Sequence, residues 1–399
     1  MDTKMIVNNN LLGYYLVDGK VFNDKTQAIL YANENKRHID YNFFKEVFGV
    51  LNWNDEPETS LDEFYKIRAQ QLRDKYDYLI AFCSGGADSS QMALSFLKNG
   101  IRLDEIYAAA PLTGLKNFQA NNKNNHATNT VSETFYAQIP FLEEIKSKYP
   151  DVKITVNDYF EDMLEYKEDD WLFRSSDWIH PTTVARYSLE KFDHIKKLVD
   201  KGKRVAALYG NNKPHVAIEN NKFICAIEDL SLNVARPAFL NHDIALEPFF
   251  TTPELPLLLV KQAWAVRKWA LEANQDLRIS MLKFKSDYRK SNYREGLVSN
   301  WNNQIWNNGI YERAIVPVIY PSLNYNYFQA LKPNNKILAD MDSWFYDLHK
   351  DTKTYKMILS DVSNFVKAID LMYFTTTVKS GFVVYRNVYE FGSALQVNR

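Results

Sequence analysis

The sequence predicts an α/β protein whose core is a doubly wound parallel sheet, with a small N-terminal α+β segment and a mostly helical C-terminal region. Three observations predict this class. Short apolar runs of strand length recur between residues 76 and 209, longer helical stretches separate them, and the first run leads directly into a glycine-rich segment that opens a helix. Uninterrupted apolar runs are typical of strands buried on both faces, as in parallel sheets.

The strands that we expect in the core are continuous apolar or β-branched stretches. They are YDYLIAF (76–82), DEIYAAA (104–110), VKITV (152–156) and RVAALY (204–209). The clearest helical stretch between them covers residues 182–201, and Pro181 suits the position just before it. The alternation places the core domain at residues 74–250.

Residues 1–73 form the expected N-terminal segment. Asp18-Gly19 lies between aromatic and apolar runs, which predicts a β-hairpin over residues 12–22. Ser60 and Glu63 form a capping box, so a helix should start there and run to about Arg73. Two further helical patterns are expected at residues 25–35 and 41–50.

The C-terminal region, residues 251–399, begins with two prolines and continues into helical patterns. We expect helices at residues 260–274, 343–350 and 355–374. The last patterned run, GFVVYRNVYEF (381–391), alternates as a strand does.

Composition excludes several classes of protein. The 399 residues are 46% hydrophobic and carry 48 Lys and Arg against 49 Asp and Glu, so there is no overall basic field that would hold nucleic acid. Two cysteines are too few for a disulfide scaffold, and no apolar run approaches the roughly 20 residues that span a bilayer. We therefore expect a cytoplasmic protein without a membrane partner. The abundance of Asn, Lys, Tyr and Phe is typical of an AT-rich genome such as that of a large phage, which would place the protein in the host cytoplasm.

The segment after the first core strand combines two adjacent glycines with hydroxyl side chains and one carboxylate. It consists of Ser84, Gly85, Gly86, Ala87, Asp88, Ser89 and Ser90. Glycines let a backbone turn sharply and bring its N–H groups close to an anion, and the following helix adds its positive end. A carboxylate beside phosphates is repulsive unless a divalent cation lies between them. Asp88 therefore indicates Mg²⁺ bound together with a polyphosphate.

This SGGADSS segment resembles the SGGxDS loop of the PP-loop ATP pyrophosphatase superfamily, which includes asparagine synthetase, NAD synthetase and the related phosphoadenosine-phosphosulfate reductases. The resemblance implies an adenine nucleotide alpha-hydrolase-like domain that binds ATP and Mg²⁺ through residues 84–90. It also implies cleavage between the α and β phosphates. The alternative is a Gly-Gly turn from strand to helix whose Ser and Asp side chains serve only as caps. Neither GxxxxGK[ST] nor GxGxxG opening a helix is present.

A second candidate segment, GNNKPH, follows the 204–209 strand. Gly210, Asn212 and Lys213 resemble part of the Gly-Thr-x-Asn-Lys stretch of NAD synthetase. The carboxyl ends of parallel strands share one edge, so Lys213 is expected to reach the triphosphate and act catalytically with Asp88. A polar turn after a strand is the competing interpretation.

The sequence lacks several features of particular members of the superfamily, which narrows the set of enzymes that it resembles. The chain has no cysteine before Cys83, so we expect no glutaminase domain of the asparagine-synthetase kind in this chain. The Gly-Glu-Gly-x-Asp-Glu stretch of asparagine synthetase is missing from the sequence, as are the paired zinc cysteines of several tRNA thiolases.

The expected function is an AMP-forming ligase, asparagine-synthetase-like without a glutaminase. It would adenylate a carboxylate or carbonyl oxygen and transfer the activated group to an amine or ammonia. The acceptor is a small molecule or is derived from nucleic acid, and homo-oligomerisation is left open. Two alternatives remain. A sulfonucleotide reductase or sulfur-transfer enzyme would need Cys83 or Cys225, and a regulatory protein would hold the nucleotide without turnover.

Overall fold

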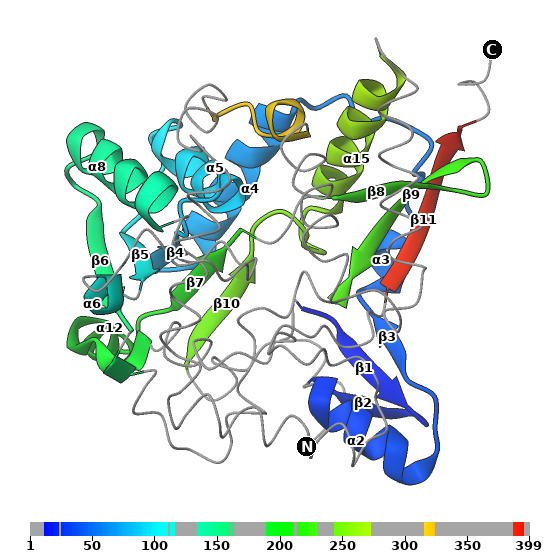
Figure 1. Cartoon of the computed structure of the whole chain (residues 1–399), viewed down its shortest axis with the longest axis horizontal. Coiled ribbons are helices and arrows are strands. Elements are labelled where there is room, and N and C mark those ends of the chain that lie inside the picture. The colour runs from blue at the N-terminus through cyan, green and yellow to red at the C-terminus, as the bar shows by residue number, and fades with distance from the viewer. Residues whose placement is uncertain are drawn as a thin grey trace, which may run out of the picture.

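The computed structural model of the chain is shown in Figure 1. It describes residues 12–23, 25–110, 112–115, 134–159, 161–162, 189–210, 214–229, 243–272, 315–323 and 386–394.

A five-stranded parallel sheet forms the centre of the protein. Its strands are β4 (Tyr78–Phe82), β5 (Glu105–Ala110), β6 (Lys153–Asp158), β7 (Val205–Tyr209) and β10 (Ile244–Pro248). Their order is β10-β7-β4-β5-β6, and every neighbouring pair is parallel. The chain thus adds β5 and β6 on one side of β4 and then returns to add β7 and β10 on the other. The four expected core strands are confirmed, and β10 was not predicted.

Helices cover both faces of this sheet. They are α4 (Leu61–Lys75), α5 (Ala87–Leu97), α8 (Ile139–Lys148) and α12 (Asp193–Asp200). Leu79 and Ala81 of β4 belong to the larger hydrophobic cluster, together with buried side chains of α4, α5 and α8. Ile80 and Phe82 point to the opposite face and join the smaller cluster, which includes Ile195 of α12. The protein is therefore α/β with the layered arrangement expected of a doubly wound sheet (Figure 1).

The N-terminal part contains a three-stranded sheet of order β2-β1-β3. Its elements are β1 (Tyr14–Val17), β2 (Lys20–Phe22), α2 (Lys25–Asn35), β3 (Asp40–Asn42) and α3 (Lys45–Phe48). Asp18 and Gly19 have positive φ angles of 52° and 78°, so the predicted hairpin turn is confirmed. The helix expected at residues 41–50 is wrong in its first part. Residues 40–42 pair with β1 instead, and Phe44 has a left-handed φ of 46° that separates β3 from α3.

The predicted start of α4 is confirmed. The Ser60 hydroxyl accepts a hydrogen bond from the Glu63 amide at 3.2 Å. The helix expected over 182–201 is confirmed in its last part as α12 (Asp193–Asp200). It is not continuous, because a short 3₁₀ turn at Leu189–Lys191 is separated from α12 by Phe192 in an extended conformation, and residues 182–188 lie outside the described residues. The helix expected near residue 260 is confirmed as α15 (Pro256–Leu271).

A second sheet is antiparallel and has the order β11-β9-β8. Its strands are β8 (His215–Glu219), β9 (Lys222–Glu228) and β11 (Arg386–Ser393). The expected strand near the C-terminus is confirmed as β11, whereas the β8–β9 hairpin was not predicted. Within the described ranges, no helix is long and apolar enough to cross a membrane.

A buried ion network fixes β10 against α4. Arg68 is fully buried and donates to Glu247 at 3.0 Å, to Glu254 at 2.7 Å and to the Pro248 carbonyl at 2.9 Å. Lys75 donates to the same two carboxylates at 2.6 Å each. Burial opposes ionisation of Glu254, but the hydrogen bonds from Lys75 and Arg68 outweigh it and lower the pKa of Glu254. The network holds the carboxyl end of β10 in place beside the candidate site.

Candidate functional site

The glycine-rich loop is cross-linked by its own hydroxyl groups. The Ser84 amide donates to the Ser89 hydroxyl at 3.2 Å, and the Gly86 amide donates to the Ser84 hydroxyl at 3.2 Å. The Ser89 hydroxyl in turn donates to the Gly86 carbonyl at 3.2 Å, and the two serine hydroxyls are 3.3 Å apart. These bonds tie the turn after β4 to the first turn of α5 and so hold the loop in a defined shape.

The loop presents the start of a helix. Gly86 is the N-cap of α5, without a side-chain cap, and Asp88 lies in the first turn. The first amides of a helix have no acceptor within it and carry its positive end. No described residue accepts a hydrogen bond from the amide of Gly85 or Ala87. The arrangement suits an anion at the carboxyl end of β4.

The two glycines of the loop serve different purposes. Gly85 has a φ of +79°, and a Cβ there would stand 2.2 Å from the amide nitrogen of Gln138. Gln138 ends a π-helix, η1 (Thr134–Gln138), and its side-chain amide donates to the Cys83 carbonyl at 2.7 Å. Gly85 is thus needed for packing against η1, a reason that the sequence did not reveal. Gly86 has an ordinary extended backbone with a φ of −70°.

Gly210 brings the end of β7 to the loop. A Cβ on Gly210 would lie 2.8 Å from the carbonyl carbon of Asp88 and 2.9 Å from the amide nitrogen of Ser89. The order of strands reverses between β4 and β7, and ligands of open α/β sheets bind at such a reversal. The structure therefore joins Gly210 to the loop residues. Asn212 and Lys213 lie outside the described residues.

Tyr320 reaches the loop from the C-terminal region. Its hydroxyl donates to Oδ1 of Asp88, although 232 positions separate the two residues. The backbone after it is held by α5, since the Ser322 amide donates to the Gln91 side chain at 3.0 Å and Lys98 donates to the Ser322 carbonyl. No sequence pattern indicated Tyr320, because nothing in its local sequence distinguishes this tyrosine from the other 24.

The donor set is compatible with Mg²⁺ that arrives with a polyphosphate. Among the described residues there is no group of three or more His, Cys, Asp and Glu that could form a protein cage for a metal. Mg²⁺ usually binds to one or two carboxylates plus substrate phosphates and water. Asp88, in the first turn of α5, would provide the single carboxylate of such a site.

The two cysteines are in different places and both are buried. Cys83 is 2% exposed and Cys225 is 0% exposed. Burial raises the pKa of the Cys225 thiol to about 12. Neither thiol has the exposure that favours reactivity.

A buried His–Glu pair lies in the second sheet. His215, the last residue of the GNNKPH segment, places Nδ1 2.6 Å from Oε1 of Glu228. The two residues are 4% and 2% exposed. This pair was not predicted, because the β8–β9 hairpin that forms it was not predicted.

Comparison with protein-family models gives no match to this chain, and comparisons with curated proteins and with solved structures give no match either. Fold and site alone define the class: an α/β protein with a five-stranded parallel sheet and a glycine-rich loop at the point where its strand order reverses.

Proposed function

We propose that this protein binds ATP and Mg²⁺ at the loop between β4 and α5 and acts as an AMP-forming ligase of the PP-loop type. The observation that carries the proposal is the position of the SGGADSS segment. It connects the central strand to a helix beside the reversal between β4 and β7, where α/β sheets bind ligands.

The loop provides the groups that would bind phosphate. The amides of Gly85 and Ala87 and the positive end of α5 favour negative charge. The hydroxyls of Ser84 and Ser89 already hold the loop in shape, so little ordering is required when an anion binds.

Asp88 is the residue that would hold Mg²⁺ with the phosphates. The ion, when bound, neutralises charge on the departing pyrophosphate. Asp88 lies in the first turn of α5, directly after Ala87 of the loop.

The chemistry that we propose is adenylation. An oxygen of a carboxylate or carbonyl substrate attacks the α-phosphorus, the bond to the bridging oxygen breaks, and pyrophosphate leaves with that oxygen. An amine or ammonia then displaces AMP. The protein contributes mainly preorganised charge and hydrogen bonds. Lys213 remains a predicted catalytic residue, and Lys213→Ala should slow AMP formation by about 10²-fold with a smaller effect on ATP affinity.

The test is incubation with α-labelled ATP, Mg²⁺ and a panel of metabolites and nucleic acids. We expect labelled AMP and free pyrophosphate over many turnovers, and loss of both in Asp88→Asn. Formation of ADP would contradict the proposal. Nucleotide binding without any turnover would instead support the regulatory alternative.

The sulfur-transfer alternative receives less support. It requires a reactive thiol near the nucleotide, and both Cys83 and Cys225 are buried. If the ligase proposal is correct, replacing both cysteines with Ala should leave AMP formation intact in the folded protein.

A further inference from the structure

We propose that Tyr320 is a positioning residue for Asp88, and that the segment 315–323 is therefore part of the Mg²⁺–nucleotide site. This inference rests on the proposed function. The Tyr320 hydroxyl donates to one carboxylate oxygen of Asp88, Oδ1. A carboxylate held through one oxygen has a restricted orientation. Metal-binding carboxylates are commonly oriented by such hydrogen bonds from a second residue.

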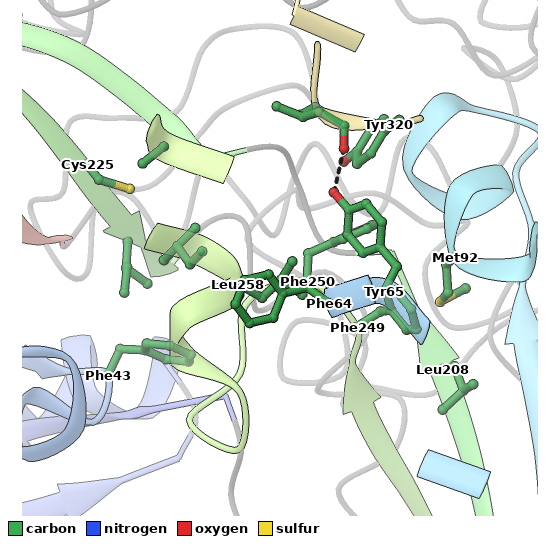
Figure 2. Close-up of a cluster of buried hydrophobic side chains, with 14 of the residues drawn as sticks. Phe43, Phe64, Tyr65, Met92, Leu208, Cys225, Phe249, Phe250, Leu258 and Tyr320 are labelled. Carbon is green, nitrogen blue, oxygen red and sulfur yellow. Dashed lines mark hydrogen bonds between the residues drawn. The ribbon is translucent and has the colours of Figure 1, made fainter. Parts of the chain in front are cut away.

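The Tyr320 ring is itself held rigidly. Tyr320 is 1% exposed, and its ring centroid is 5.1 Å from that of Phe250 and 6.4 Å from that of Tyr65. Figure 2 shows Tyr320 in the same buried cluster as Tyr65 and Phe250. A hydroxyl on an immobilised ring provides a fixed point from which to orient Asp88.

The backbone that carries Tyr320 is anchored separately. The Tyr65 hydroxyl donates to the Ile319 carbonyl at 2.5 Å and accepts a hydrogen bond from Gln262 at 2.8 Å. Burial raises the pKa of Tyr65 well above its usual range, so this hydroxyl stays protonated and able to donate. Tyr65 lies on α4 and Gln262 on α15, so two helices outside the loop hold the segment.

Tyr65 and Tyr320 have similar buried surroundings, but their hydroxyls donate to different acceptors. Both are almost fully buried, at 1% exposure each, and both hydroxyls donate to an oxygen. Only the Tyr320 hydroxyl donates to Asp88. Because the Tyr65 hydroxyl also anchors the segment that carries Tyr320, the matched control is Tyr41→Phe. It removes another buried tyrosine hydroxyl, which donates to the Leu12 carbonyl at 3.0 Å in the N-terminal part rather than to this segment.

The experiment measures binding of a non-hydrolysable ATP analogue by calorimetry, with Mg²⁺ and with EDTA, for the parent protein and its variants. We expect Tyr320→Phe to weaken binding in Mg²⁺ by about 10-fold or more, the range for residues that orient metal ligands. Binding in EDTA should change less than about threefold, and Tyr41→Phe should keep the Mg²⁺ effect of the parent. In the Asp88→Asn background, Tyr320→Phe should cause no further loss of the Mg²⁺ effect.

Several results would overturn the inference: an unchanged Mg²⁺ effect in Tyr320→Phe, an equal loss in Tyr41→Phe, or additive losses with Asp88→Asn. If Asp88→Asn loses the Mg²⁺ effect while Tyr320→Phe keeps it, only the role of Tyr320 fails. If the parent protein binds no nucleotide, the proposed function fails and this inference fails with it. Tyr320→Phe retains the packed ring, and a thermal unfolding curve establishes that it is folded.

Discussion

Gly210 lies against the main chain of Asp88 so closely that a Cβ on Gly210 would be 2.8 Å from the Asp88 carbonyl carbon. This contact joins the carboxyl ends of two sheet strands that are far apart in sequence. It also means that the first turn of α5 can take its position only if residue 210 has no side chain.

Gly210→Ala should displace the start of α5. Overpacking of this kind costs about 1–3 kcal/mol of unfolding free energy. Binding of Mg²⁺–ATP should also weaken by about tenfold, because the loop amides move with the helix. Urea unfolding and nucleotide titration measure the two effects. Gly202→Ala is the control: its φ is +71° and no atom lies within 4 Å, so it should lose stability without a change in affinity. Unaltered affinity in a folded Gly210→Ala protein would contradict this expectation.

Gly85→Ala should destabilise the protein much more than Gly100→Ala. Both glycines have positive φ angles, +79° and +65°, so both variants bear a left-handed strain of about 1–2 kcal/mol. Only at Gly85 would the added Cβ also clash with backbone, because it would lie 2.2 Å from the Gln138 amide nitrogen. The two unfolding free energies, measured by denaturant titration, should therefore differ by more than their uncertainty. Similar losses would mean that η1 moves away at little cost.

Gly86, with an ordinary φ of −70°, is the better position at which to test anion binding. Here Gly86→Val should fold and lose ATP affinity, because its side chain blocks the approach of phosphate to the loop.

Asp88→Asn should weaken binding of Mg²⁺–ATP by at least about tenfold and leave binding of AMP nearly unchanged, because only the polyphosphate brings the ion. Calorimetric titrations with each ligand measure the difference. Asp62→Asn is a matched control, since Asp62 also lies in the first turn of a helix but belongs to α4. Equal losses for ATP and AMP would reduce Asp88 to a structural role at the start of its helix.

Arg68→Ala should lower the unfolding free energy by about 3–5 kcal/mol. The change removes one partner of Glu247, a carboxylate with no exposed side-chain surface, and leaves that charge only partly compensated. Arg204→Ala offers a comparison at the surface, because the Arg204 and Asp77 side chains are 60% and 36% exposed. Its effect should be a small fraction of the first. Comparable losses in denaturant titration would mean that the buried network contributes little beyond a surface pair.

Cys225 should resist a thiol reagent in the native protein across the range from pH 7 to 9. Its pKa is raised to about 12, so at pH 8 only about one molecule in 10⁴ carries the reactive thiolate, and that fraction rises tenfold per pH unit. Mass spectrometry after brief labelling should find Cys225 modified only when denaturant is present. Rapid native labelling would restore support for sulfur chemistry.

The parallel core was readable from the sequence because its strands are short apolar runs, and the hairpin was readable because Asp18-Gly19 favours left-handed angles. The β8–β9 hairpin carried a similar signal: Asn220 and Asn221 have φ angles of 50° and 59° between apolar runs, and asparagine tolerates such angles. That signal was missed. β10 was not recognisable in the same way, since IALEP contains the polar Glu247. Its burial depends on hydrogen bonds from distant residues, among them Arg68 and Lys75.

The candidate site was likewise only partly predictable from the sequence. The loop itself is a local sequence pattern and could be located. The contacts of Gln138 with Gly85 and of Tyr320 with Asp88 depend on how distant segments pack, which no local pattern records. Sequence reasoning therefore assigned Gly85 to a sharp turn and the close approach of an anion, not to packing against η1, and it did not include Tyr320.

The antiparallel sheet has a consequence for the order in which the chain can fold during synthesis. β9 pairs with β8 across a two-residue turn. Its other edge pairs with β11, which begins more than 150 positions later in the chain. Asn387 of β11 also bonds the backbone of Tyr41 and Phe43. Until β11 leaves the ribosome, β9 has an open edge that another chain could pair with. Slow translation before residue 386 should therefore favour aggregation, and a peptide of the β11 sequence supplied in trans should suppress it.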